Sequence, residues 1–531
     1  MVFLRSRRWT ERHHPYRRHA ATFDNTIEKD VAPEPLTGEE VLAKVEVRHI
    51  LDVMHIEKNC CDAIIGTLLN IPGKTKDGVN ARLDMVDMGI KTDVKVVAGE
   101  KKTKLPLGSW NLLHKEKKRV CGSFYGMSVP TGFSSNIRNL VSMADLKLAG
   151  LKSHDCHTVM QHLLPVALRS VLEKLVRYAI IRFCLFFKAI CSKVIDVSRL
   201  KQMQADLVDT VCLLEKFFPT SFFNVMIHLT LHLVREVEWC GPMFFRWMYP
   251  FERYMKMFKG YVKNQHFPEG CIAKKYIVEE AIEFLEDRVL SQSGTTVGIP
   301  STSIARHYKQ SRPLSRPTMV SVYAKEHKEY LKLIYPNHVK NKKWMREKEN
   351  ETFPDWLKEK VANQLRLKPN NVSQTVRWLA AGPKNVVPTY ATYHVNGVDF
   401  KTKERDNVHS FQNSGVTLLA NAMQVASARD QNPSDSVMDF YGVIKSIWEV
   451  DYYKFRVPVF YCDWVESTRG VKVDELGFTL VKLNRLGHLN DPFVLATHVK
   501  QIFYIEDPLD AEWSVVVRCP NKDYRGIDDN D

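Results

Sequence analysis

Apolar residues recur at every third or fourth position through the middle of the chain, from about residue 140 to residue 290. The stretches with this spacing are HDCHTVMQHLLPVALRSVL, LEKLVRYAIIRFCLFFKAICSKV, VSRLKQMQADLVDTVCLLEKFF, SFFNVMIHLTLHLVREV and IAKKYIVEEAIEFLEDRVL. Pro219 and the Gly241-Pro242 pair interrupt them. Helices with an apolar face bury it against one another. The pattern therefore predicts an α-helical bundle over residues 140–290.

Shorter helices are predicted nearer the N-terminus. Thr37 and Glu40 have the spacing of a capping box, which marks the start of a helix. The stretch ILDVMHIEKNCCDAIIGTLLNI has helical spacing and ends at Pro72 and Gly73, and ARLDMVDMGI follows it. The residues before about 40 are basic and then proline-rich, so we expect no core of their own there.

The pattern changes after the bundle. Residues 291–430 show little periodicity apart from one short amphipathic stretch, AKEHKEYLKLIY, and predict a linker or irregular region. Short β-branched and aromatic runs separated by turn residues then follow, such as YGVIKSIWEV, KFRVPVFYCDWVE and KQIFYIED. They predict a small antiparallel barrel or sheet of about five or six strands.

The expected fold class is therefore α+β with several domains. The predicted segments are an N-terminal segment (1–110), a helical domain (140–290), the irregular region (291–430) and a β-rich C-terminal domain (431–520). No internal repeat of solenoid period is visible.

Composition adds a partner class and a compartment. The formal net charge of +15 favours polyanions, with nucleic acid first among them. Eleven cysteines without a C-x-x-C pair are typical of reduced thiols in the cytosol or nucleus. The basic N-terminus has no apolar run behind it, and Arg182 and Lys188 interrupt the most apolar stretch. We therefore expect neither a secretory signal nor a membrane partner.

Two pairs of side chains have the spacing of metal ligands. His228 and His232 are four residues apart, and Asp52 and His55 are three apart, so each pair shares one helix face. Together they would supply the four ligands of a tetrahedral zinc site. The alternative is that the histidines lie at the edge of the core and are satisfied by hydrogen bonds.

A basic and aromatic helix follows the histidines. Glu252 lies in its predicted first turn, where the helix dipole alone would favour it or where it could bind a catalytic divalent cation. The basic residues suit a phosphate backbone, or an ordinary solvated face. They are Arg246, Arg253, Lys256, Lys259 and Lys263. No glycine-rich phosphate loop, G-x-S-x-G or H-E-x-x-H motif is present.

Long motifs connect the chain with one family. LDVMHIEKNCCDAIIGTLLNIPGKTKDGVNARLDMVDMGI resembles the C-terminal end of the transposase domain of plant CACTA (En/Spm-like) transposons. GLKSHDCHTVMQHLLPVALRSVL and GPMFFRWMYPFERYMKMFKGYVKN are similar to the domain of unknown function that follows it. DFYGVIKSIWEVDYYKFRVPVFYCDWVE and GVKVDELGFTLVKLNRLGHLNDPFVLATHVKQIFYIEDP resemble a second, C-terminal domain of unknown function in the same proteins.

The resemblance implies a DDE/D transposase, with an RNase H-like fold interrupted by a helical insertion. A zinc site joins the insertion to the core in related recombinases, so Asp52, His55, His228 and His232 become its candidates. Glu252 becomes the third catalytic acid, which would bind Mg²⁺ or Mn²⁺. The implied partners are the DNA of transposon ends, an intact transposase or a second copy of the chain, in the nucleus.

The chain departs from the family where two catalytic Asp residues should precede this region. Without them two metals cannot be held around a phosphate, so we expect a truncated, transposon-derived protein that binds DNA and lacks catalysis. One alternative is a domesticated DNA- or chromatin-interaction protein; another is an active transposase with an incomplete gene model. In the domesticated protein, C-terminal aromatics line a groove rather than fill a core. They are Trp448, Tyr452, Tyr453, Phe460 and Trp464.

Overall fold

The computed structural model describes residues 6–33, 51–97, 105–293, 317–367, 372–424 and 434–519. These residues form two compact units. The helical unit contains the described residues up to 124 and from 140 to 293. The sheet unit contains residues 125–139 and the described residues from 317 onwards. Each unit is described by itself. The capping box predicted at Thr37 and Glu40 lies outside the described residues.

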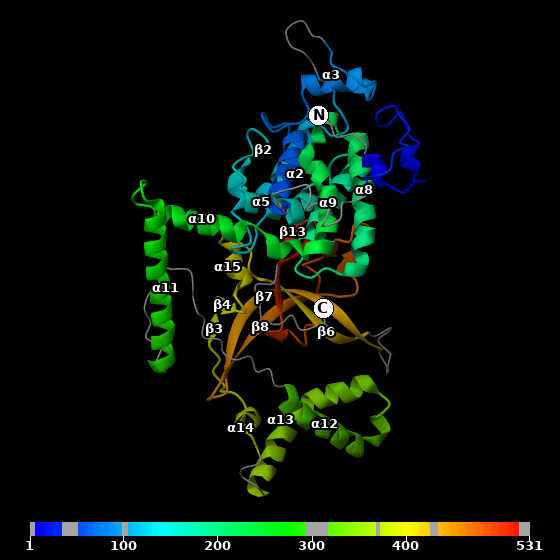
Figure 1. Ribbon diagram of the computed structural model, residues 1–531. Coiled ribbons are helices and arrows are strands. Elements are labelled where there is room, and N and C mark those ends of the chain that lie inside the picture. The colour runs from blue at the N-terminus through cyan, green and yellow to red at the C-terminus, as the bar shows by residue number, and fades with distance from the viewer. Residues whose placement is uncertain are drawn as a thin grey trace. The chain divides into compact units, whose positions relative to one another are not determined.

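The described part of the helical unit consists mainly of α-helices (Figure 1). They are α2 (Val53–Leu68), α3 (Val79–Asp87), α4 (His114–Gly126, which ends just past the boundary), α5 (Ser153–Thr158), α6 (Leu164–Ala167), α7 (Lys174–Ile190), α8 (Leu200–Phe217), α9 (Val225–Cys240), α10 (Tyr249–Tyr261) and α11 (Pro268–Ser293). A short hairpin, β1 (Val141–Ser142) and β2 (Lys147–Leu148), precedes α5.

Local sequence sets the ends of these helices. The carboxylate of Asp52 accepts hydrogen bonds from the backbone N–H groups of Met54 and His55 at the start of α2. The Asn224 side chain caps α9 in the same way. These caps satisfy N–H groups that have no partner within the helix. Helix α9 ends at Gly241, which adopts a left-handed φ of 76°.

A widened turn joins α5 to α6. Residues Val159–Leu163 form a π-helical turn, and Pro165 follows as the second residue of α6. Proline has no N–H to continue the α-helical ladder, and its ring crowds the preceding turn. The wider turn accommodates this change without ending the helix.

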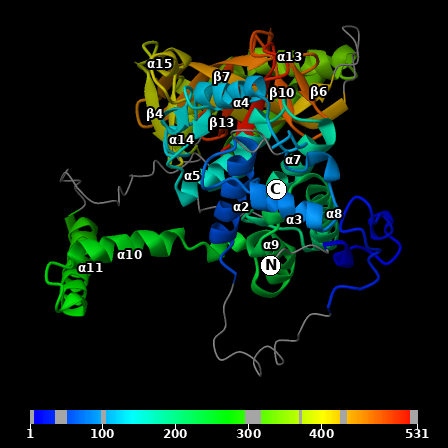
Figure 2. The same ribbon diagram turned by 90° about the horizontal axis from the view of Figure 1, so that it is seen from above.

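The core of the helical unit lies between α7, α8 and the helices around them. Phe183 and Phe187 of α7 are fully buried, as are Phe218, which caps the end of α8, and Phe222 in the turn that follows. Rings of this size dominate the burial of apolar area. The predicted helical character of this region is confirmed, and α10 and α11 project from the bundle (Figures 1 and 2).

The sheet unit begins with a small helical cluster. It comprises α12 (Pro317–Ile334), α13 (Lys342–Leu367) and α14 (Gln374–Ala381). Leu357, Val361, Val376 and Ala380 form a core of their own between these helices. The region predicted to be irregular is therefore largely helical in its described residues. Its apolar positions were too widely spaced among charged residues to be recognised.

An antiparallel, curled sheet follows. Its strands are β3 (Thr389–Tyr390), β6 (Gly415–Gln424), β7 (Ser434–Asp451), β8 (Arg456–Val465), β9 (Val471–Val473), β10 (Thr479–Val481), β11 (Leu486–Gly487), β12 (Phe493–Leu495), β13 (Lys500–Glu506) and β14 (Ser514–Arg518). The main path runs β11-β8-β7-β6-β13-β14-β10-β9, with β12 on β8 and β3 on β7. Between β3 and β6 lie a hairpin of β4 (Thr392–Val395) and β5 (Val398–Lys401) and the short helix α15 (Lys403–Asn407).

The predicted α+β class with a β-rich C-terminal region is confirmed. The sheet of the described residues has ten strands rather than five or six. Pairing of β6 with β7 begins at Gly415, ahead of the predicted boundary at residue 431. No helix among the described residues is long and apolar enough to cross a membrane.

Candidate nucleic-acid interface

Helices α10 and α11 form an arm that leaves the helical bundle beyond α9. In both views α10 runs outward from the bundle of α2, α5 and α9, and α11 turns off its far end (Figures 1 and 2). At the corner, the Tyr261 hydroxyl donates to the Glu279 carboxylate, and Lys275 lies 4.5 Å from the centre of the Tyr261 ring. Tyr261 is the one large apolar side chain of this corner that is buried among the described residues of the arm.

Arg246 fixes the link between α9 and the arm. Its guanidinium forms an ion pair with Glu236 at 3.2 Å and donates to the carbonyls of Glu236 and Gly241 at 3.4 Å each. Glu236 in turn accepts from the backbone N–H of Leu51, ahead of α2. Arg246, predicted as a DNA contact, therefore has a structural role at the foot of the arm.

A polar cluster supports the first residues of the arm. The carboxylate of Glu57 in α2 is buried and lies 2.7 Å from Nδ1 of His157 in α5. It also accepts from the Gln161 amide at 2.9 Å. The His157 ring lies edge-on to Trp247, with centroids 4.7 Å apart. The Tyr249 hydroxyl donates to the Ser153 carbonyl at 3.2 Å, which ties the start of α10 to α5.

Sequence reasoning missed this cluster. Glu57 lies in the same LDVMHIEKN motif as Asp52 and His55, and His157 lies in GLKSHDCHTV. The available signal was the presence of an acid and a histidine within two apolar helices, where unpaired charge is costly. Glu57 and His157 are 100 positions apart, so the sequence gave no indication that they are in contact.

Three lysines at the end of α10 face solvent and form a lysine stripe. Lys256 and Lys259 are one turn apart on the same side of the helix. Lys263 follows two residues beyond the end of the helix at Tyr261. All three are exposed, and none forms an ion pair with a residue that the structure describes. The side chain of Arg253 lies outside the described part. This lysine stripe is the cationic surface of the arm.

Glu252 is exposed at the start of α10, near the positive end of the helix dipole. Metal-dependent phosphate chemistry requires several carboxylates converging on a metal. Among the described residues no three His, Cys, Asp or Glu side chains gather in a group suited to a metal. The described residues around Glu252 thus do not assemble such a group.

The two histidines of α9 do meet. Their Nε2 atoms are 3.3 Å apart, and the Trp9 ring lies edge-on to both, with its centroid 5.3 Å from that of His232. Burial lowers the pKa of His228, assisted by the positive charge of Arg8. Burial also lowers the pKa of His232, together with the charges of His228 and Arg235. The pair is therefore favoured in its neutral form.

The other two predicted zinc ligands do not join this pair. Asp52 uses its carboxylate to cap α2, and the side chain of His55 is exposed. The described residues thus do not assemble the predicted four-ligand zinc site. The alternative considered from the sequence, histidines at the edge of the core, describes the observed environment of His228 and His232.

The basic N-terminal segment packs against α8. Arg7 is fully buried, pairs with Asp24 at 2.5 Å and donates to the Thr26 carbonyl. Arg17 donates to several backbone carbonyls, including that of Asp30 at 2.8 Å. The backbone N–H of Ser6 donates to Glu215 of α8. Arg7 and Arg17 thus form their contacts inside the folded protein and contribute little to a nucleic-acid surface.

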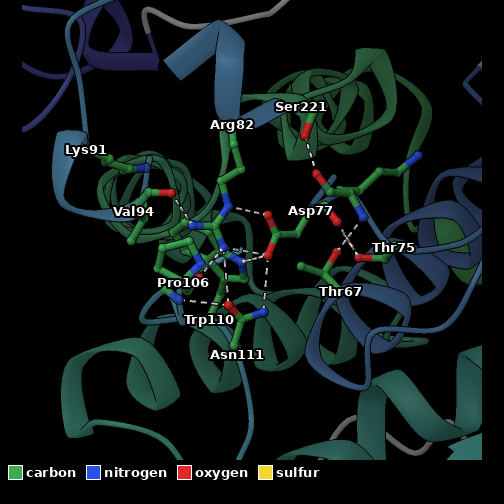
Figure 3. A network of polar contacts seen from close by, with 12 residues as sticks. Thr67, Thr75, Asp77, Arg82, Lys91, Val94, Pro106, Trp110, Asn111 and Ser221 are labelled. Carbon is green, nitrogen blue, oxygen red and sulfur yellow. Dashed lines mark hydrogen bonds and ion pairs between the residues drawn. The ribbon is translucent and has the colours of Figure 1, made fainter. Parts of the chain in front are cut away.

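A second buried network closes the loop between α2 and α4 (Figure 3). Arg82 binds both carboxylate oxygens of Asp77, at 2.6 and 2.8 Å, and the Trp110 indole donates to the same carboxylate at 2.9 Å. Burial would raise the pKa of Asp77, but hydrogen bonds from Arg82, Trp110 and Asn111 lower it below the ordinary value. Burial lowers the pKa of Lys91, which donates to carbonyls of α8, to about 8.

The C-terminal aromatic residues do not form one groove. Phe460 and Trp464 are buried in the sheet core, where Gly442 leaves room for the Trp464 ring. Trp448 lies half-buried beside Tyr461 and Phe493. In the hairpin between β7 and β8, the ring of Tyr452 stacks on that of Phe455, and that of Tyr453 packs near that of Trp378. The core interpretation of the sequence applies to Phe460 and Trp464.

Two parts of the chain match family models. Residues 190–297 match a domain of unknown function, DUF4218, and residues 448–516 match another, DUF4216. The first includes α8, α9 and the whole arm, and the second includes most of the sheet after β7. The expected resemblance to two domains of unknown function is confirmed. No curated protein and no solved structure matches the chain.

Proposed function

We propose that this chain is a transposon-derived protein, related to CACTA transposases, that binds DNA through the arm and does not itself catalyse strand transfer. The observation that carries the proposal is the lysine stripe of α10. Lys256 and Lys259 on α10, and Lys263 just beyond its end, are exposed and have no ion-pair partner among the described residues. The pair of matched domains, which is typical of plant transposase-derived proteins, supports the family assignment.

The spacing of the helical lysines suits a phosphate backbone. From Lys256 to Lys259 the helix rises by about 4.5 Å, at 1.5 Å per residue. One strand of duplex DNA presents a phosphate about every 3.4 Å along its axis, so both lysines can reach neighbouring phosphates. Lysine contacts of this kind position a protein on DNA without reading its sequence. We therefore expect strong salt dependence and little sequence preference from the arm.

The noncatalytic part of the proposal rests on the position of Glu252. Among the described residues, no group of acidic side chains gathers with this exposed carboxylate, and a DDE/D mechanism needs several to hold its two metal ions. Glu252 is therefore assigned to the helix start, where it opposes rather than assists the binding of a polyanion.

The test compares two pairs of lysines in the full chain by fluorescence anisotropy with duplex DNA. The variant Lys256→Ala/Lys259→Ala removes two stripe lysines, and we expect affinity to fall about tenfold at low salt. The matched control, Lys115→Ala/Lys118→Ala, removes exposed lysines with the same spacing from α4. Equal losses of affinity in both variants would show that binding depends on net charge alone. No loss of affinity in either variant would show that the arm is not the DNA contact.

A separate experiment tests whether the chain cleaves or joins DNA strands. The chain is incubated with labelled DNA and Mn²⁺, and we expect no cleavage or joining products. Products that vanish in Glu252→Gln would overturn the noncatalytic assignment.

A further inference from the structure

A cavity of about 490 Å³ lies between α7 and α8 in the helical unit. The two helices pack against each other, and the segment that joins them, residues 191–199, forms part of the cavity wall. The volume is in the range of sites that bind small molecules. The cavity shares no residue with the arm, so it is separate from the proposed DNA contact.

Much of the cavity wall is apolar. The apolar side chains that line it are Leu185, Phe186, Ala189, Ile195, Met203 and Leu207. Leu185, Ile195 and Met203 are only partly buried, and Val194 at the rim is 69% exposed. Water against such side chains is displaced favourably by an apolar group. The wall therefore suits the hydrocarbon part of a ligand.

The two carboxylates that line the cavity already have partners. Asp196 accepts from the backbone N–H and the hydroxyl of Ser198, at 2.9 and 2.7 Å. Asp206 accepts from the Arg182 guanidinium at 2.9 Å and from the Gln202 amide at 3.2 Å. A cationic ligand would have to compete with these hydrogen bonds.

The guanidinium groups, in contrast, keep unused donors. Among the described residues, the Arg199 side chain has neither a hydrogen bond nor an ion pair, and it lines the cavity. Arg182 donates through Nη2 to Asp206, which leaves further N–H groups of the five in its guanidinium. Residues 188–201 carry four basic residues and one acidic residue, so this end of the cavity is positive. The unused donors and the positive charge favour an anion.

We propose that the cavity binds a small amphiphilic anion, with its apolar body between α7 and α8 and its carboxylate, or an equivalent anionic group, on Arg199. From Arg199 to Asp206 the chain rises by about 10 Å, at 1.5 Å per residue, which is roughly the length of an extended octanoate. Arg199 fixes the charged end, and the apolar wall with Met203 holds the chain.

The test is isothermal titration calorimetry of the full chain with octanoate, octanol and octylammonium, which share one apolar body and differ in the headgroup. We expect octanoate to bind at least about tenfold more tightly than octylammonium. Arg199→Gln should weaken octanoate binding about tenfold, to the level of octanol. The matched control, Lys201→Gln, removes the same charge two positions away from an exposed residue outside the cavity and should retain the affinity.

A second variant tests the apolar part of the site. Ala189→Phe places a larger side chain in the cavity wall and should weaken octanoate and octanol alike. Arg199 is exposed, so Arg199→Gln should keep the helical circular dichroism of the wild type and tests the proposal even where Ala189→Phe unfolds. Failure of octanoate to bind the wild type would overturn the proposal. Equal affinities for octanoate and octylammonium, or equal losses in Arg199→Gln and Lys201→Gln, would overturn it as well.

Discussion

Glu57 and His157 are 100 positions apart in the sequence, yet the Glu57 carboxylate lies 2.7 Å from Nδ1 of His157 inside the helical unit. The pair joins α2 to α5, and the His157 ring contacts Trp247 at the foot of the arm. A buried carboxylate is stable only when its oxygens are paired. We infer that this pair fixes the point from which α10 leaves the bundle.

Removing the carboxylate should destabilise the protein. Glu57→Ala leaves His157 and Gln161 without their buried acceptor, so the free energy of unfolding should fall by about 3 kcal/mol. Urea denaturation followed by circular dichroism measures the change. The control Glu238→Ala removes an exposed acid of α9 and should cost less than about 0.5 kcal/mol. Similar small losses in both variants would show that the Glu57 contacts are energetically unimportant.

The Asp77–Arg82 network should make stability depend on acid pH. The pKa of Asp77 is lower in the folded protein than its ordinary value of 3.8, so its contribution is complete above that value and is lost as the pH falls through the folded pKa. Asp77→Asn should lower the free energy of unfolding by about 2 kcal/mol at neutral pH. The difference from the wild type should shrink on acidification below 3.8; a difference independent of pH would contradict this account.

The histidine pair of α9 should produce a second pH dependence with a different range. Folding lowers the pKa of His228 and His232 below the ordinary value of 6.5, so protons bind the unfolded chain first. Stability should therefore decrease as the pH falls below 6.5 and stop decreasing below the folded pKa values. His228→Gln/His232→Gln should lose less stability over this range. Thermal unfolding at a series of pH values provides the measurement, and identical profiles would refute the assignment.

Zinc should have little effect on the protein. Two adjacent imidazoles supply only half of a structural zinc site, and Asp52 is occupied as a helix cap. We expect zinc in excess to leave the midpoint of thermal unfolding nearly unchanged. A rise of several degrees that disappears in His228→Ala would show instead that Asp52 and His55 rearrange to complete the site.

Features set by local sequence were predictable. The end of α9 at Gly241 follows from the glycine and the proline after it, and the strands after residue 431 follow from alternating β-branched and aromatic residues. Helices rich in charge, such as α13, were not recognised, because Leu357 and Val361 are sparse apolar positions among charged neighbours. Their core forms only when α12, α13 and α14 come together.

The candidate site was predictable only in part. Helical spacing predicted that Lys256 and Lys259 share one face of α10, and both are exposed there, whereas Lys263 lies beyond the end of the helix. The roles of Arg246 and Asp52 were not predictable. The ion pair of Arg246 with Glu236 and the cap that Asp52 forms on α2 depend on the surrounding folded structure. Spacing identifies residues that share a face, but not whether another part of the protein already uses them.

The salt dependence of DNA binding tests the central claim most directly. The logarithm of the binding constant of the full chain for duplex DNA is measured against the logarithm of salt concentration. Each lysine–phosphate contact contributes about 0.9 to the slope, so Lys256→Ala/Lys259→Ala should reduce its magnitude by about 1.8. Lys115→Ala/Lys118→Ala should leave it nearly unchanged. A slope identical in the wild type and the stripe variant would contradict the account, because the arm would then make no contact with the phosphate backbone.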